Sequence, residues 1–233
     1  MAGSPSKHHK SDADQLVLEG VDAGQLDLRE FDRVVSEKFG TVCGIDEAGR
    51  GPLAGDVYAA AVILDCDNPI EGLNDSKKLT PKKREKLFDE IVAKAKAYCI
   101  AVSTVEQIEA TDILSADLDA MKRAYEGLGV PADIVIVDGD VLPEISVNLR
   151  NLNGGDAKSE AVAAASILAK VARDRYMDEQ AKKYPEYGFE KHKGYGTKAH
   201  YAAVDEHGLC PIHRKSFFKK YFAKKAKQDG QES

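Results

Sequence analysis

Four acidic residues stand at points of the sequence where α/β proteins commonly place functional groups. Asp46 and Glu47 end the apolar stretch TVCGID and lead into the Gly- and Pro-rich segment AGRGPLAG. Asp138 ends the apolar run IVIVD, and Asp156 precedes a long alanine-rich segment. Sites of open α/β sheets lie beyond the ends of strands, so these positions can bring carboxylates together.

Each acid also has a purely structural explanation. A pair before a turn, such as Asp46 and Glu47, is usually solvated or caps backbone amides. Neighbouring side chains of a regular strand also point to opposite faces, so both can serve one site only where the strand twists or ends. Asp138 suits a turn, and Asp156 suits the N-cap of the following helix. The acids therefore indicate chemistry only if they converge.

A converged carboxylate cluster would need a cation. Two carboxylates about 4 Å apart repel each other by roughly 4 kcal/mol at an effective dielectric constant near 20. Hard oxygen ligands with few histidines nearby favour Mg2+ or Mn2+ over zinc. The sequence thus predicts a site for one of these ions if the strand ends meet.

Glycine and basic residues near these acids are able to bind a sugar-phosphate backbone. Gly49 and Gly51 lack a β-carbon and flank Arg50, so the backbone can approach a sugar closely while the guanidinium pairs with a phosphate oxygen. Lys77 and Lys78 supply two further cations. A tripeptide and a lysine pair are weak signals when taken alone.

The C-terminal part adds positive charge to a chain whose net charge is -6. From Phe189 to Lys227, ten Lys and Arg residues stand against three acidic ones. Such a segment can follow a phosphate backbone, or it can simply be a solvated helix face. Within it, Tyr195 lies between two glycines, where its ring can contact a base or sugar or merely pack in a turn.

Composition limits the class of protein. A chain of 233 residues with 43% hydrophobic content can bury a sizeable core, and we favour one domain. No apolar run approaches the roughly 20 residues of a membrane span, and Met1 to Asp12 has no secretory apolar stretch, so we expect a soluble, cytoplasmic protein. The four cysteines predict free thiols. A zinc site at His207, Cys210 and His213 lacks a convincing fourth ligand.

Alternating strand-like and helical segments would position these residues. Strands are predicted at 41–46, 56–65, 99–105, 134–138 and 145–149. Helices are predicted at 28–39, 80–98, 113–128, 159–183, 198–207 and 214–225. Residues 1–12 are polar and small and predict a disordered leader. Strands that alternate with helices indicate an α/β domain with a mixed sheet.

Six segments, in order and with matching spacing, resemble ribonuclease HII. They are GIDEAGRGPLAG (44–55), DSKKL (75–79), VDGD (137–140), GGDAKS (154–159), AAASILAKVARDRYM (163–177) and HKGYGT (192–197). The resemblance implies an RNase H-like fold, in which helices flank a mixed central β-sheet and the C-terminal part is helical. With it we divide the chain into a leader (1–40), a catalytic domain (41–222) and a polar tail (223–233).

The resemblance also implies a mechanism. Asp46, Glu47, Asp138 and Asp156 would bind two divalent ions, Mg2+ or Mn2+, which promote phosphodiester hydrolysis that leaves 3'-hydroxyl and 5'-phosphate ends. Asp174, inside the alanine-rich segment, would support this site, although its two arginine neighbours also suit a structural ion pair.

The implied substrates are RNA/DNA hybrids and duplex DNA that contains single ribonucleotides, cut on the 5' side of the ribonucleotide. The backbone of Gly49-Arg50-Gly51 would grip the 2'-hydroxyl, and Tyr195 would pack on the adjoining sugar. Lys77 and Lys78 would contact the substrate. Nothing in the sequence demands more than a monomer.

Two positions depart from the family pattern. Asp56 stands where the family usually has proline, which places an extra acid that either alters metal preference or faces solvent. Ala161 replaces a common serine and removes one polar contact. Two other functions compete: a different two-metal nuclease, and a catalytically silent nucleic-acid-binding module. The four acids argue against the silent module, and the GRG and GYGT segments favour ribonucleotide sensing.

Overall fold

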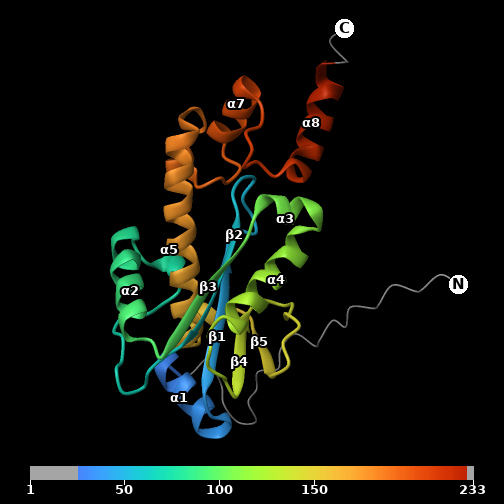
Figure 1. Ribbon diagram of the computed structural model, residues 1–233. Coiled ribbons are helices and arrows are strands. Elements are labelled where there is room, and N and C mark those ends of the chain that lie inside the picture. Colours follow the sequence, from blue (N-terminus) through green and yellow to red (C-terminus); the bar gives the residue numbers. More distant parts are fainter. Residues whose placement is uncertain (1–25, 230–233) are drawn as a thin grey trace, which may run out of the picture.

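A five-stranded mixed β-sheet forms the centre of the computed structural model (Figure 1). The structure describes residues 26–229, so the leader predicted at residues 1–12 lies outside the described residues. The strands are β1 (Val42–Ala48), β2 (Val57–Ile63), β3 (Ala97–Ser103), β4 (Ile134–Asp138) and β5 (Asn148–Leu152). Their order is β3-β2-β1-β4-β5; β2 pairs antiparallel with β1 and β3, and β4 pairs parallel with β1 and β5. The predicted α/β fold is confirmed.

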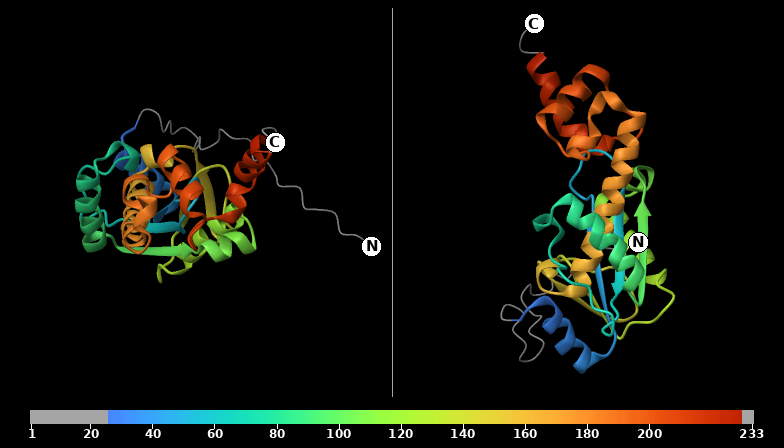
Figure 2. Two further views of the ribbon diagram at one scale, coloured as in Figure 1. Left: turned by 90° about the horizontal axis from the view of Figure 1, so that it is seen from above. Right: turned by 90° about the vertical axis from the view of Figure 1, so that its left-hand side faces the viewer.

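Helices cover both faces of the sheet and extend beyond one end of it. They are α1 (Leu28–Phe39), α2 (Pro81–Lys94), α3 (Val105–Ala110), α4 (Ile113–Glu126), α5 (Glu160–Lys183), α6 (Phe189–His192), α7 (Lys198–His207) and α8 (Lys215–Asp229). α5 packs along β1 and β2, with α2 outside it, while α4 packs against β2 and β3. α1 lies at one end of the molecule and α7 and α8 at the other (Figure 2). No helix in the described part is long and apolar enough to cross a membrane.

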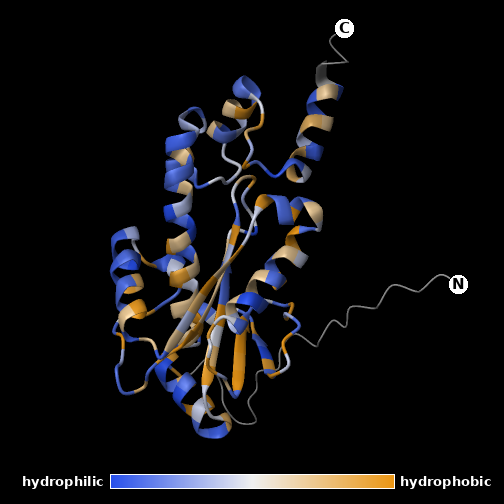
Figure 3. Cartoon of the chain, in the orientation of Figure 1, coloured by the Kyte–Doolittle hydropathy of each residue, from blue (hydrophilic) through white to orange (hydrophobic). Residues whose placement is uncertain are grey.

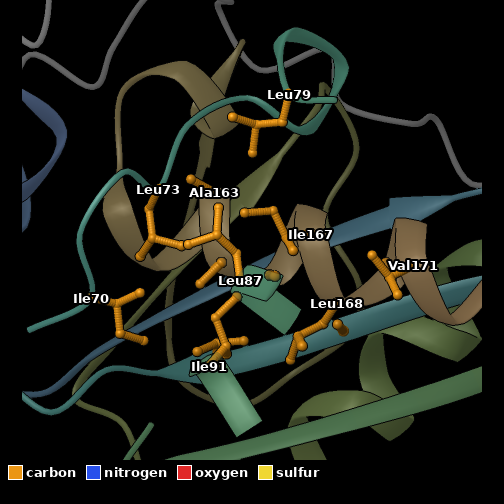
Figure 4. Packing of buried hydrophobic residues seen from close by; sticks show 14 residues of the cluster. Ile70, Leu73, Leu79, Leu87, Ile91, Ala163, Ile167, Leu168 and Val171 are labelled. Atoms are coloured by element: carbon orange, nitrogen blue, oxygen red, sulfur yellow. The ribbon is translucent and has the colours of Figure 1, made fainter. Parts of the chain in front are cut away.

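The alternation of side chains along β2 explains why both faces are covered. Ala60 belongs to the apolar cluster on the α5 face, which α2 completes with Leu87 and Ile91 (Figure 4). Ala59 and Ala61 belong to the cluster on the α4 face. A strand that is buried on both faces needs apolar residues at successive positions. Figure 3 shows orange and pale colours over much of the central strands, with blue stretches among them, and blue on many turns of the surrounding helices.

The first turn of α5 packs closely against β1. A β-carbon placed on Gly44 would lie 2.2 Å from the carbonyl carbon of Ala161, so this contact requires glycine. The N-cap of α5 is Ser159, whose side chain accepts from the Val162 amide. The alternative N-cap role for Asp156 is therefore wrong, and this residue lies instead in a short 3-10 helix, η2 (Gly155–Ala157).

α1 begins and ends where the sequence predicts and packs onto the same core. Phe31 and Val35 are fully buried against β4 and β5 residues. Asp32 accepts at Oδ2 from the Ala161 amide at 2.7 Å, which joins α1 to the first turn of α5. The predicted domain boundaries at residues 40/41 and 222/223 stay predictions. The helix α1, which precedes the first boundary, contacts β1 of the sheet, and α8 continues across the second boundary.

Some predicted bounds differ from the structure. The helix predicted at 80–98 ends at Lys94, and β3 already begins at Ala97. The strand predicted at 145–149 is out of place, because Val147 donates to the Ile145 carbonyl within a local turn and pairing with β4 starts only at Asn148. The strand predicted at 99–105 runs too far, because Thr104 and Gln107 form a capping box that starts α3. Apolar periodicity does not separate a strand from an apolar turn, whereas the Thr-x-x-Gln spacing was a usable helix signal.

Candidate active site

Three carboxylates that are far apart in the sequence meet at one edge of the sheet. Asp46 of β1, Asp138 at the end of β4 and Asp156 of η2 have ligand oxygens that all lie within 4.8 Å of one another. β1 and β4 are parallel neighbours, so their carboxyl ends share an edge. The Gly155 amide donates to Asp138 Oδ1 at 2.8 Å and holds η2 against β4. The three acids therefore converge, which is the condition on which the predicted metal site depends.

The electrostatics of this cluster suit a divalent cation. Asp46 is only 4% exposed, and its burial, then the charges of Glu47 and Asp138, raise its pKa. Burial and then Asp138 raise the pKa of Asp156. The nearest cation is Lys77, whose Nζ lies 3.5 Å from Asp156 Oδ2. One lysine does not neutralise three acids, and an all-oxygen donor set fits Mg2+ or Mn2+.

Asp46 and Glu47 occupy successive positions of β1, which in a regular strand belong to opposite faces. Asp46 shares the α5 face with Gly44, and a hydrogen bond from Ser166 of α5 lowers its pKa. Glu47 shares the α4 face with Ile45, which packs in the α4 cluster. The three-acid group does not include Glu47, so its role as a metal ligand stays a prediction. Its carboxylate is nevertheless close enough to the cluster for the charge of Asp138 to raise its pKa, although burial is the larger cause.

The GRG turn has its carbonyl groups fixed from inside by one buried arginine. Arg214 donates to the carbonyls of Gly49 at 2.6 Å, Pro52 at 2.8 Å and Gly55 at 2.7 Å. It is fully buried, and burial is the main cause that lowers its pKa. For the amides of residues 49–51, no hydrogen-bond acceptor is found among the described residues. The turn therefore keeps its donors available for a ligand.

Gly49 is required by both its conformation and its surroundings. Its φ is +110°, and a β-carbon there would lie 2.3 Å from Arg173 Nε. Arg173 is itself buried and donates to the carbonyls of Ala54, Asp56 and Lys193. The structure thus places Arg173 of the KVARD segment inside the loop that follows β1, a role that sequence reasoning missed.

Tyr195 lies beside the GRG turn. A β-carbon on Gly51 would lie 3.7 Å from Tyr195 Cε1, and the tyrosine is 46% exposed. The Gly194 carbonyl accepts from the Leu53 amide at 2.8 Å, which joins the two loops through their backbones. The two segments proposed for ribose recognition are therefore adjacent, although 144 positions separate Gly51 from Tyr195.

The two predicted lysines differ in their surroundings. Lys77 reaches the acidic cluster, as described above. The side chain of Lys78 is 63% exposed and lies 3.9 Å from Asp75. Their roles in substrate binding stay predictions, with contact to the acidic cluster found for Lys77 only.

Asp174 lies outside the three-acid cluster and forms one ion pair within α5 and one with α2. Its carboxylate contacts Lys170 at 2.6 Å and Arg84 of α2 at 3.9 Å. Arg84 in turn donates to the Ser76 and Leu79 carbonyls that flank the lysine pair. Asp174 thus forms the kind of structural ion pair that its neighbours suggested. It contacts the segment of Lys77 and Lys78 only indirectly, by way of Arg84.

The two departures from the family pattern lie away from the acidic cluster. Asp56 accepts at Oδ1 from the Val105 amide at 2.9 Å and so anchors the first turn of α3. It belongs to the surroundings of Arg173 and Tyr176, not to the three-acid group. Neither expectation for it, altered metal preference or a solvent-facing side chain, describes this contact. Ala161 is buried against Gly44.

Asp117 is a second residue that sequence reasoning missed. It lies on α4, is 1% exposed, and its Oδ2 lies 3.4 Å from Arg50 Nε. Burial and then Glu47 raise its pKa to about 8, whereas Arg50 lowers it. Its sequence signal was an acid on the buried stripe of a helix, four positions before Met121.

A pair of buried histidines supports the loop of Tyr195. His200 and His213 are in contact through their Nε2 atoms at 3.0 Å, and His200 Nδ1 lies 2.9 Å from the Tyr195 carbonyl oxygen. His213 Nδ1 accepts from the Cys210 amide at 2.9 Å, so this nitrogen has a backbone partner. Among residues 26–229, the group of side chains found to be able to hold a metal ion is the three-acid cluster.

The histidine pair predicts loss of stability in acid. Burial lowers the pKa of His200 and of His213 to about 4, against an ordinary value of 6.5. At these two sites the unfolded chain therefore binds protons that the folded chain excludes, and their contribution to stability falls as the pH drops from 6.5 toward 4. We expect acidification from pH 7.5 to pH 5 to change the melting temperature less favourably in the exposed variant His207→Gln, which keeps the pair, than in His213→Gln, which lacks one member of it. Equal differences in both variants would contradict this assignment.

Comparisons with known proteins agree with the geometry. A family model described as Ribonuclease HII matches residues 43–224. The chain is 58% identical to a ribonuclease HII of Idiomarina loihiensis over 176 residues, which cover 76% of this chain and 94% of that protein. It is 53% identical to one of Caldicellulosiruptor bescii, over 81% of this chain and 91% of that protein. The crystal structure of the ribonuclease H2 from Pyrococcus horikoshii OT3 is similar, with a TM-score of 0.65, 30% identity, and coverage of 76% and 93% of the two chains.

Proposed function

Because this chain belongs to the ribonuclease HII family, and is thus a ribonuclease H of RNA/DNA hybrids, we propose that it also cuts duplex DNA 5' of single ribonucleotides. The observation that carries this proposal is the position of the GRG turn. The turn directly follows Ala48, the last residue of β1, and Tyr195 adjoins it. One ribose between the turn and the tyrosine would place its phosphate near the acidic cluster.

The catalytic role falls to the carboxylates. Asp46, Asp138 and Asp156 would hold divalent ions, and Glu47, the next residue of β1, would join them. Two Mg2+ or Mn2+ ions bound there would supply activation of water and stabilisation of the leaving oxygen in an in-line displacement at phosphorus. The products carry 3'-hydroxyl and 5'-phosphate ends. The burial of Asp46 and the hydrogen bond from the Gly155 amide to Asp138 restrict these two carboxylates before substrate arrives.

Ribose recognition falls to the backbone of Gly49-Arg50-Gly51. Its amides have no acceptor among the described residues, and Arg214 fixes its carbonyls, so the donors are preorganised. A 2'-hydroxyl both donates and accepts, which lets backbone groups distinguish RNA from DNA. Tyr195 packs on the sugar, and its exposed ring supports this role. Deoxyribose offers no hydroxyl to this turn.

The surrounding residues take supporting roles in this proposal. When metal ions displace the Lys77 ammonium group from Asp156, that group contacts a phosphate of the substrate. Lys78, whose side chain is exposed, follows it in the same segment. Asp174 supports that segment through Arg84. We further propose a monomer located in the cytoplasm, with residues 41–222 as the catalytic domain and 1–40 and 223–233 as flanking segments.

A single incision assay tests the function. We expect a labelled DNA duplex with one ribonucleotide to be cut on the 5' side of that residue in Mg2+ or Mn2+, because the GRG turn selects the 2'-hydroxyl. The all-DNA duplex of the same sequence should remain intact, and chelation of the metal should stop the reaction. Equal cutting of both duplexes would indicate a general nuclease, and binding without cutting would indicate a silent module.

A further inference from the structure

The carboxylate of Asp117 is buried without a hydrogen bond. The residue is 1% exposed, and neither of its side-chain oxygens has a hydrogen-bond partner in the structure. Its one ion-pair contact within the described chain is Arg50 Nε, 3.4 Å from Oδ2. A buried acid without hydrogen bonds is destabilising, and such groups are uncommon in folded proteins. Asp117 therefore calls for a functional explanation.

Arg50 is held from two sides by acids on different elements. Its Nε faces Asp117 of α4, and its Nη1 faces Glu47 of β1 at 3.5 Å. No ion pair or hydrogen bond is found for Nη2 within residues 26–229, and the Arg50 side chain is 44% exposed. The guanidinium is a rigid planar fork, so fixing two of its nitrogens also fixes the direction of the third. The third nitrogen remains available to the solvent side.

Asp117 also limits the contact between Arg50 and Glu47. With only Glu47 as a partner, the guanidinium is free to turn and pair with that carboxylate through two nitrogens, the preferred geometry of such pairs. An arginine closed onto Glu47 in this way would leave no preorganised donor for the substrate. The carboxylate of Asp117 attracts Arg50 Nε away from Glu47. The remaining guanidinium nitrogen then stays available to the substrate.

We propose that Asp117 is a positioning residue that holds Arg50 in the orientation needed to contact a phosphate of the nucleic-acid substrate. The proposal rests on the proposed substrate contact of Arg50. It assigns Asp117 no contact with substrate or metal, and so no catalytic role. Burial of the Asp117 carboxylate lowers the stability of the folded protein, and the same carboxylate orients Arg50. Such a loss of stability in favour of function is common at binding sites.

Asp117→Asn tests this proposal, because it keeps the shape and removes the charge. On an RNA/DNA hybrid we expect KM to rise about five- to tenfold through loss of preorganisation of a long side chain. The value of kcat should change by less than about twofold, since no catalytic group is removed. The melting temperature should stay the same or rise. Asp117→Ala should show the same rise in KM.

Asp119→Asn is the matched control, because Asp119 lies on the same helix but its side chain is 52% exposed and pairs with Arg123. It should leave KM unchanged. Arg50→Ala and the double variant Asp117→Asn/Arg50→Ala complete a cycle. If Asp117 acts through Arg50, its substitution adds nothing to KM in the Arg50→Ala background.

An equal rise in KM with and without Arg50 would overturn the proposal, as would an unchanged KM in Asp117→Asn. A lowered melting temperature together with a lowered kcat would indicate a merely structural role and would also overturn it. Failure of the wild-type protein to cut the single-ribonucleotide duplex is a separate result. It would contradict the proposed incision activity while the hybrid assay still decides the role of Asp117.

Discussion

Asp138→Asn should lower turnover of an RNA/DNA hybrid on the order of 10³-fold, equivalent to about 4 kcal/mol of transition-state stabilisation. Asp138 lies at the centre of the charge cluster, since its carboxylate raises the pKa values of Asp46, Glu47 and Asp156. The amide cannot provide the same charge to a divalent ion. Asp46→Asn should lose turnover to the same degree, because its carboxylate belongs to the same three-acid group.

Binding of duplex should survive these substitutions. The proposed substrate contacts at residues 49–51 and at Tyr195 are untouched, and removing one of several repelling acids does not destabilise the metal-free fold. The measurements are single-turnover cleavage, binding by fluorescence anisotropy without metal, and melting temperature. Asp140→Asn is the matched control, because Asp140 is exposed two positions beyond Asp138. Wild-type rates in Asp138→Asn would show that the ligands are misassigned.

Arg214→Ala should destabilise the protein by about 3–5 kcal/mol, the usual cost of removing one partner of a buried charged network. The side chain is fully buried and donates to four carbonyl groups of the loop that follows β1. Its loss leaves these acceptors unsatisfied and frees the GRG turn to change conformation. We therefore also expect weaker discrimination between a ribonucleotide and a deoxyribonucleotide. Denaturant unfolding and the two-duplex incision assay measure the two effects.

Arg214→Lys separates charge from geometry at this position. Lysine keeps the positive charge but lacks the planar fork, so it should recover part of the stability and little of the discrimination. Lys215→Ala is the matched control, because Lys215 is the exposed neighbour in the sequence. An Arg214→Ala protein with wild-type stability would show that the loop carbonyls find other donors. If Arg214→Ala still discriminated fully between a ribonucleotide and a deoxyribonucleotide, the conformation of the GRG turn would not be needed for ribose recognition.

The position of most elements follows from local pattern in the sequence. The helix at 28–39 and the strand at 134–138 have the predicted bounds, and α5 begins one residue after its predicted start. Helical and strand periods repeat within a few residues, so neighbouring side chains are enough to reveal them. The three aspartates could be proposed for the same reason, because each stands next to a recognisable strand end or helix start. Six ordered motifs then identified the family.

The contacts that tune the site follow only from tertiary packing. Arg214 reaches the Gly49 carbonyl across 165 positions of sequence, and Asp117 meets Arg50 because α4 packs on the face of β1 that carries Glu47. Nothing local marks a buried arginine as the support of a distant turn. A strand period predicts that Asp46 and Glu47 face apart, but which helix covers each face depends on the arrangement of the whole domain. The charged residues that surround the acids of β1 are therefore brought there by the tertiary fold and not by the local sequence.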